Sequence, residues 1–107
     1  MKVEELKTLF ASVNEGDMER EVKGVFCCDL LSIAMGKAPA DYAWVTVMAN
    51  VNTLAVASLT DVACVVLAEG AKLDEATAAK AAEQGITVFE TKEPIFEAAL
   101  RIRDRII

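Results

Sequence analysis

The sequence lacks histidine altogether, and among its 107 residues only three are cysteine and two are proline. The absence of histidine removes the most common general base and the most common metal ligand. Three cysteines are an odd number without framework spacing, and the adjacent Cys27 and Cys28 are poorly placed to bridge each other. We therefore expect reduced thiols, no bound metal, no cofactor and no catalytic residues.

Positive charge is also scarce, because 17 acidic residues face 11 basic ones and the net charge is −6. Such a chain repels phosphate backbones and anionic lipid head groups, so neither nucleic acid nor a membrane is an expected partner. No stretch reaches the roughly 18 apolar residues of a membrane span, and the first ten residues do not resemble a signal peptide. The expected location is the cytoplasm.

The length fits one domain, residues 1–107, with one continuous core. Hydrophobic residues make up 54% of the chain but aromatic ones only 6%, which predicts an aliphatic core. Apolar residues recur at helical spacing from Val3 to Val13, so we expect an N-terminal helix within residues 1–16. Residues 20–107 are expected to form βα repeats.

Short runs rich in valine and other apolar residues predict four strands, at residues 22–28, 43–48, 63–70 and 86–89. Between and after them, helical patterns are expected at residues 30–35, 50–58, 74–84 and 95–106. Asp29 is expected to cap the first of these helices and Gly36 to end it. Asp74 and Gly85 are expected to begin and end the third.

Alternating strands and helices predict an α/β fold, a three-layer sandwich with a small, mostly parallel sheet of about four strands flanked by helices. Ligands of open sheets of this kind favour the crevice beyond the carboxyl ends of the strands. The ligand-binding residues expected there are Cys28, Asp29, Ser32, Asn50, Asn52, Glu69 and Gly70.

Several of these residues also have structural interpretations. Cys27, Cys28 and Cys64 could be buried structural thiols or could carry redox chemistry. Asp29 and Ser32 could accept hydrogen bonds from the terminal amides of the following helix. Alternatively, the free amides at residues 29–32 together with Ser32 could bind a phosphate. Capping explains one of Asn50 and Asn52, but not both.

Three segments carry a family likeness: CDLLSIAMG at residues 28–36, WVTVMANVNTLAVASLTDVACVVLAEG at 44–70 and AAEQGITVFET at 81–91. Together they resemble the DRTGG domain, which is similar to the amino-terminal domain of HPr kinase/phosphorylase. Cys28 stands where the family usually has glycine, and Asn50 where a histidine is common.

The resemblance implies a noncatalytic regulatory or assembly module, expected to be a homodimer, that senses a small metabolite or nucleotide at the strand ends. Members of the family occur beside nucleotide-sensing modules and in association with iron hydrogenases, so a protein partner in such a metabolic system is also expected. The alternative is a redox accessory protein of a hydrogenase system that binds metal or uses a reactive cysteine. A catalytic alternative would require Cys28 and Glu69 within hydrogen-bond reach.

Overall fold

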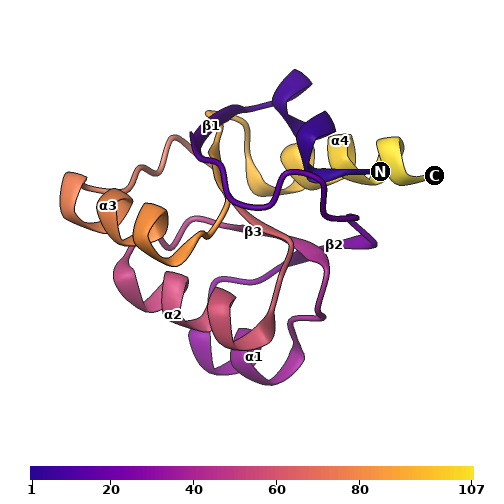
Figure 1. Ribbon diagram of the computed structural model, residues 1–107. Coiled ribbons are helices and arrows are strands. Elements are labelled where there is room, and N and C mark those ends of the chain that lie inside the picture. The colour runs from indigo at the N-terminus through magenta and orange to yellow at the C-terminus, as the bar shows by residue number, and fades with distance from the viewer.

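The computed structural model describes residues 1–107 as three layers, a five-stranded sheet with helices on both faces (Figure 1). The strands are β1 (Ala11–Asn14), β2 (Gly24–Cys27), β3 (Tyr42–Thr46), β4 (Cys64–Leu67) and β5 (Val88–Glu90). The helices are the 3₁₀ helix η1 (Val3–Thr8), α1 (Leu31–Lys37), α2 (Val51–Thr60), α3 (Glu75–Gln84) and α4 (Ile95–Ile106). The predicted α/β sandwich is confirmed, with five strands in place of about four. None of the helices is long and apolar enough to cross a bilayer.

The strand order is β1-β5-β4-β3-β2, and the four strands from β2 to β5 are parallel and follow the order of the chain. Since every crossover steps in the same direction with the same hand, α1, α2 and α3 all cover one face. Helix α4 returns across the other face, where it lies with η1 (Figure 1). The parallel strands therefore have no reversal of order, and β2 is left as an edge strand.

The predicted N-terminal helix, residues 1–16, is found only in its first part and as a 3₁₀ helix. The chain forms only the short helix η1 and then β1, which pairs antiparallel with β5. Val3 and Leu6 are both fully buried, because a 3₁₀ helix has three residues per turn and places them on one face. Phe10, in the bend between η1 and β1, packs in the same core, so the apolar spacing continues beyond the end of the helix.

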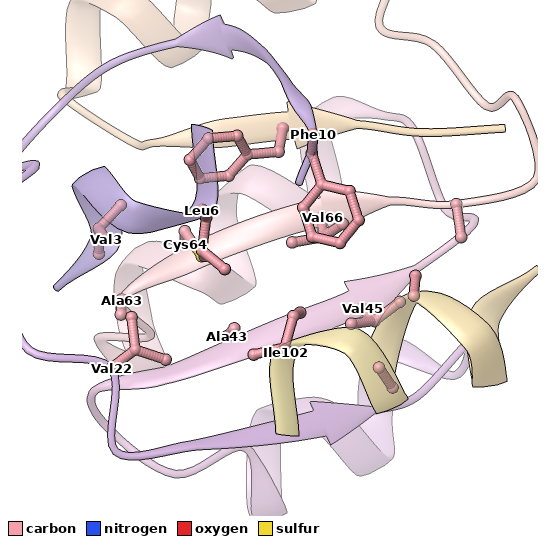
Figure 2. Packing of buried hydrophobic residues seen from close by; sticks show 14 residues of the cluster. Val3, Leu6, Phe10, Val22, Ala43, Val45, Ala63, Cys64, Val66 and Ile102 are labelled. Atoms are coloured by element: carbon pink, nitrogen blue, oxygen red, sulfur yellow. The ribbon is translucent and has the colours of Figure 1, made fainter. Parts of the chain in front are cut away.

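Each face of the sheet has its own core. On the side of η1 and α4, Leu6, Phe10, Val66 and Ile102 pack together (Figure 2). On the side of α1, α2 and α3, the largest buried side chain is Trp44 of β3. The two cores account for the near-continuous apolar run that predicted β4, because both faces of that strand are covered.

Two of the four residues predicted to begin or end helices, Asp74 and Gly85, are confirmed. The Asp74 side chain accepts a hydrogen bond from the Thr77 amide (2.8 Å), and Gly85 ends α3 in the left-handed conformation. Two predictions at α1 are wrong. Its N-cap is Leu30, which offers no side-chain bond, and Asp29 is engaged elsewhere. Gly36 lies inside α1, which continues to Lys37 because nothing at Gly36 requires a left-handed turn.

A cluster of charged residues, which we call the Arg20 clamp, lies at the end of the sheet where the parallel strands β3 and β4 begin. Arg20 donates from Nε to Asp41 Oδ1 (2.9 Å) and from Nη1 to Asp61 Oδ1 (3.0 Å). Both aspartates have positive φ, so the clamp holds two left-handed turns in place. The hydrogen bond from Arg20 and then that from Lys23 lower the pKa of the Asp41 carboxyl.

We expect Arg20→Ala to lower the free energy of unfolding by about 2 kcal/mol at pH 7. Because the pKa of Asp41 is lower in the folded protein, its stabilisation is complete above the ordinary aspartate pKa and is lost as pH falls through the lowered value. The variant should therefore lose less stability than the wild type on acidification below about pH 4. Urea unfolding at several pH values measures this, with Lys80→Ala, on an exposed helix face, as control. Equal acid sensitivity in wild type and Arg20→Ala would contradict the clamp.

Candidate functional site

The carboxyl ends of the four parallel strands meet at one edge of the sheet, which we call the strand-end rim. It comprises residues 28–32, 47–52, 69–72 and 90–92. All seven residues expected to bind ligand lie on this rim, because each follows β2, β3 or β4 directly or begins the next helix. The arrangement does not bring all of them to one pocket.

Asp29 fastens the end of β2 to the end of β3. Its Oδ1 accepts hydrogen bonds from Thr46 Oγ1 (2.7 Å) and from the Val47 amide (2.9 Å). Thr46 Oγ1 in turn accepts from the Met48 amide (3.2 Å). Thr46 is fully buried, so the carboxylate satisfies a hydroxyl that water cannot reach. The role predicted for Asp29, helix capping, is replaced by this link between two strand ends.

Cys28 is held through its backbone. Its amide donates to the Val45 carbonyl (3.3 Å), and its carbonyl accepts from the indole Nε1 of Trp44 (3.0 Å). Its thiol donates a hydrogen bond from Sγ to the carbonyl of Leu30, two residues further along the chain (3.3 Å). Three partners thus fix the first turn of the rim before α1 begins.

The three cysteines do not gather. Cys27 is exposed, Cys28 is half-buried and Cys64 is buried in the core, and no group of three histidine, cysteine, aspartate or glutamate side chains lies close enough to hold a metal. Burial raises the pKa of the Cys64 thiol to about 12. Partial desolvation of its sulfur by neighbouring groups, followed by the negative charge of Asp29, raises the pKa of the Cys27 thiol, although the residue is exposed. Both groups are therefore thiols at neutral pH.

Asn50 and Asn52 have different roles. Asn50 caps α2, where its Oδ1 accepts a hydrogen bond from the Thr53 amide (3.1 Å). Asn52 is exposed in the first turn of α2, and Ser32 is exposed in the first turn of α1. Capping accounts for Asn50, which leaves Asn52 and Ser32 accessible to a ligand.

Glu69 and Gly70 form a left-handed turn after β4, with φ of 59° and 76°. Their amides donate to the carbonyls of Glu93 (2.9 Å) and Thr91 (3.0 Å), which ties this turn to the segment before α4. Glu69 is exposed, and no hydrogen bond joins it to Cys28. Cys28 and Glu69 follow strands separated by β3, an axis-to-axis distance of about 10 Å.

Beside this turn lies a pocket of about 260 Å³. Its lining residues are Ala11, Gly70, Ala71, Lys72, Glu90, Thr91 and Lys92. Lys72 pairs with Glu90 at 3.0 Å, whereas Lys92 makes no ion pair. Of the residues expected to bind ligand, only Gly70 lines this pocket. Ala11 of β1 forms one wall of the pocket. Because β1 is not predicted from the sequence, this pocket could not be predicted either.

A second surface lies at the open edge of β2, and we call it the β2–α4 face. It is a groove of about 260 Å³ lined by Val25, Cys27, Phe96, Ala99, Leu100 and Arg103. Phe96 is 69% exposed and Leu100 is 45% exposed, although both are large apolar side chains. Exposed apolar groups gathered around a free strand edge are typical of protein–protein contacts.

No family model matches the sequence, and no curated protein matches it either. The resemblance to the DRTGG domain therefore stays a prediction.

Proposed function

We propose that this chain is a noncatalytic regulatory or assembly module of the DRTGG type, which self-associates and senses a small anionic metabolite or nucleotide at the strand-end rim. The observation that carries the proposal is the β2–α4 face, where an unpaired strand edge lies beside exposed Phe96 and Leu100. In a monomer these apolar side chains stay in contact with water, whereas a partner would remove them from water, which lowers the free energy.

The pocket beside the left-handed turn supports the sensing part of the proposal. Lys92, which makes no ion pair, offers an ammonium group to a phosphate or acyl phosphate beside the Lys72–Glu90 pair, in a chain whose net charge otherwise repels anions. The segment that carries Lys92 leads directly into α4, which supplies Phe96 to the β2–α4 face. A ligand that orders this segment would favour one position of α4 and so shift the association equilibrium.

Self-association is tested by light scattering of the full chain. We expect a mass twice that of the 11.5-kDa chain at roughly 100 µM, as for an interface of modest affinity. A monomer throughout this range would overturn the assembly proposal.

Ligand sensing is tested by thermal shift with nucleotides and acyl phosphates, since a ligand selective for the folded protein raises its Tm. We expect Lys92→Ala to remove the rise and Lys37→Ala, an exposed lysine at the far end of α1, to retain it. A rise of equal size in both variants would place the anion elsewhere.

A further inference from the structure

We propose that the partner on the β2–α4 face is a second copy of this chain, docked by antiparallel pairing of the two β2 strands about Phe26, so that a two-fold axis joins the sheets into one. This inference rests on the proposed self-association and adds its geometry. It follows from the hydrogen-bonding direction of β2, from the faces of the sheet to which its side chains point and from the spacing of side chains on α4.

The backbone of β2 offers two residues to a partner strand. The Cys28 amide donates to Val45 on β3, and the backbone groups of a strand alternate in direction. The N–H and C=O groups of Phe26 therefore face β3, while those of Val25 and Cys27 face the open edge. A hydrogen-bonded antiparallel pair exchanges two bonds, so Val25 and Cys27 together can supply four across a two-fold axis.

The faces of the sheet fix the register. Val25 packs toward the core of α4, and Phe26 toward the core of α1. In a continuous sheet, residues opposite each other point to the same face, so Val25 must oppose an odd-numbered residue of the second copy. Pairing Val25 with Cys27 of the second copy uses all four outward groups and places Phe26 opposite itself.

The charged residues beside β2 are engaged within their own copy. Lys23 Nζ pairs with Asp41 Oδ2 (3.3 Å), and Asp29 Oδ1 accepts from Thr46 and Val47 at the end of β3. The backbone still favours the register about Phe26. A register shifted by two residues would place Lys23 opposite Cys27, but the Lys23 amide already donates to the Asp41 carbonyl (2.9 Å) and cannot donate across the axis.

The two α4 helices also run antiparallel under this symmetry. Phe96 and Arg103 lie on either side of Leu100 along the exposed stripe of α4. Arg103 of each copy is thereby directed to the Phe96 ring of the other, a cation–π arrangement that occurs twice. The two Leu100 side chains meet near the axis, where they cover each other.

The first test replaces the leucine near the axis. Leu100→Glu brings two carboxylates together in the interface and should raise the dimer Kd by about 100-fold or more in sedimentation equilibrium. Leu100 is already 45% exposed, so the monomer should keep its fold and its circular dichroism spectrum. The matched control is Leu59→Glu, at a 74% exposed position on α2, which should leave the Kd unchanged.

The second test reads the register. In Val25→Cys, the introduced thiol lies opposite Cys27 of the second copy, so mild oxidation should give a disulfide-linked dimer through that pair, identified by peptide mass spectrometry. Ala55→Cys, on an exposed position of α2, should give no such dimer. A wild-type dimer that persists in Leu100→Glu and does not cross-link in Val25→Cys would refute this docking mode and leave self-association standing. A wild-type monomer would refute both.

Discussion

Replacing Trp44 with alanine is expected to lower the free energy of unfolding by about 3–5 kcal/mol, the largest effect of any single substitution considered for this chain. The Trp44 side chain is fully buried between β3 and the helices α1 and α2. Its removal leaves a large cavity and also deprives the Cys28 carbonyl of its donor. Urea unfolding followed by circular dichroism measures the loss.

Trp44→Phe separates these two contributions. The phenyl ring keeps much of the apolar contact, but the Cys28 carbonyl loses the indole N–H, which should cost about 1–3 kcal/mol. Hydrogen exchange at residues 28–32 should rise in this variant while exchange in α3 stays unchanged. If Trp44→Ala cost less than 1 kcal/mol, or Trp44→Phe left exchange at the rim unaltered, the proposed support of the rim by Trp44 would be wrong.

The second large effect is expected for Gly16→Ala, which should destabilise the protein by about 2–3 kcal/mol. A Cβ atom at Gly16 would lie 2.1 Å from the Gly85 carbonyl oxygen, so the backbone of one loop must move. The movement would also strain the hydrogen bond from the Gly16 amide to Thr87 Oγ1 (2.9 Å). Thermal and urea unfolding measure the loss.

Gly36→Ala is the matched control for this substitution. No atom lies within 4 Å of a Cβ at Gly36, which is inside α1, so alanine should stabilise the protein by about 0.5–1 kcal/mol. Opposite signs at the two positions are the expected result. Destabilisation of equal size at both would mean that the loss reflects glycine replacement in general and not the approach of Gly85.

Much of the fold could be predicted because local signals agree with tertiary contacts. Asp74 and Gly85 carry cap chemistry that acts within one turn, and they begin and end α3 as expected. The buried positions of α4 follow the same logic, since Ala99 and Ile102 recur at helical spacing and both are buried. β1 could not be predicted in this way, because its four residues become a strand only by pairing with β5.

The candidate site was less accessible to sequence reasoning. The strand-end rim follows from the alternation of strands and helices, whereas the partner of each polar group depends on which strands are neighbours. Asp29 looks like a helix cap along the chain, and only the adjacency of β2 and β3 brings Thr46 to it. The β2–α4 face depends on β2 being at an edge, which the strand order decides.

The order of the strands also bears on how the chain folds. From β2 to β5, every neighbour in the sheet is the next strand along the chain, so each pairing closes only a short loop. The exception is β1, where Ala11 pairs with Glu90 near the opposite end of the sequence. Loop-closure entropy therefore opposes this contact most strongly, and β1 should dock last. The pocket lined by Ala11 and Lys92 should then be complete only after the parallel strands have formed.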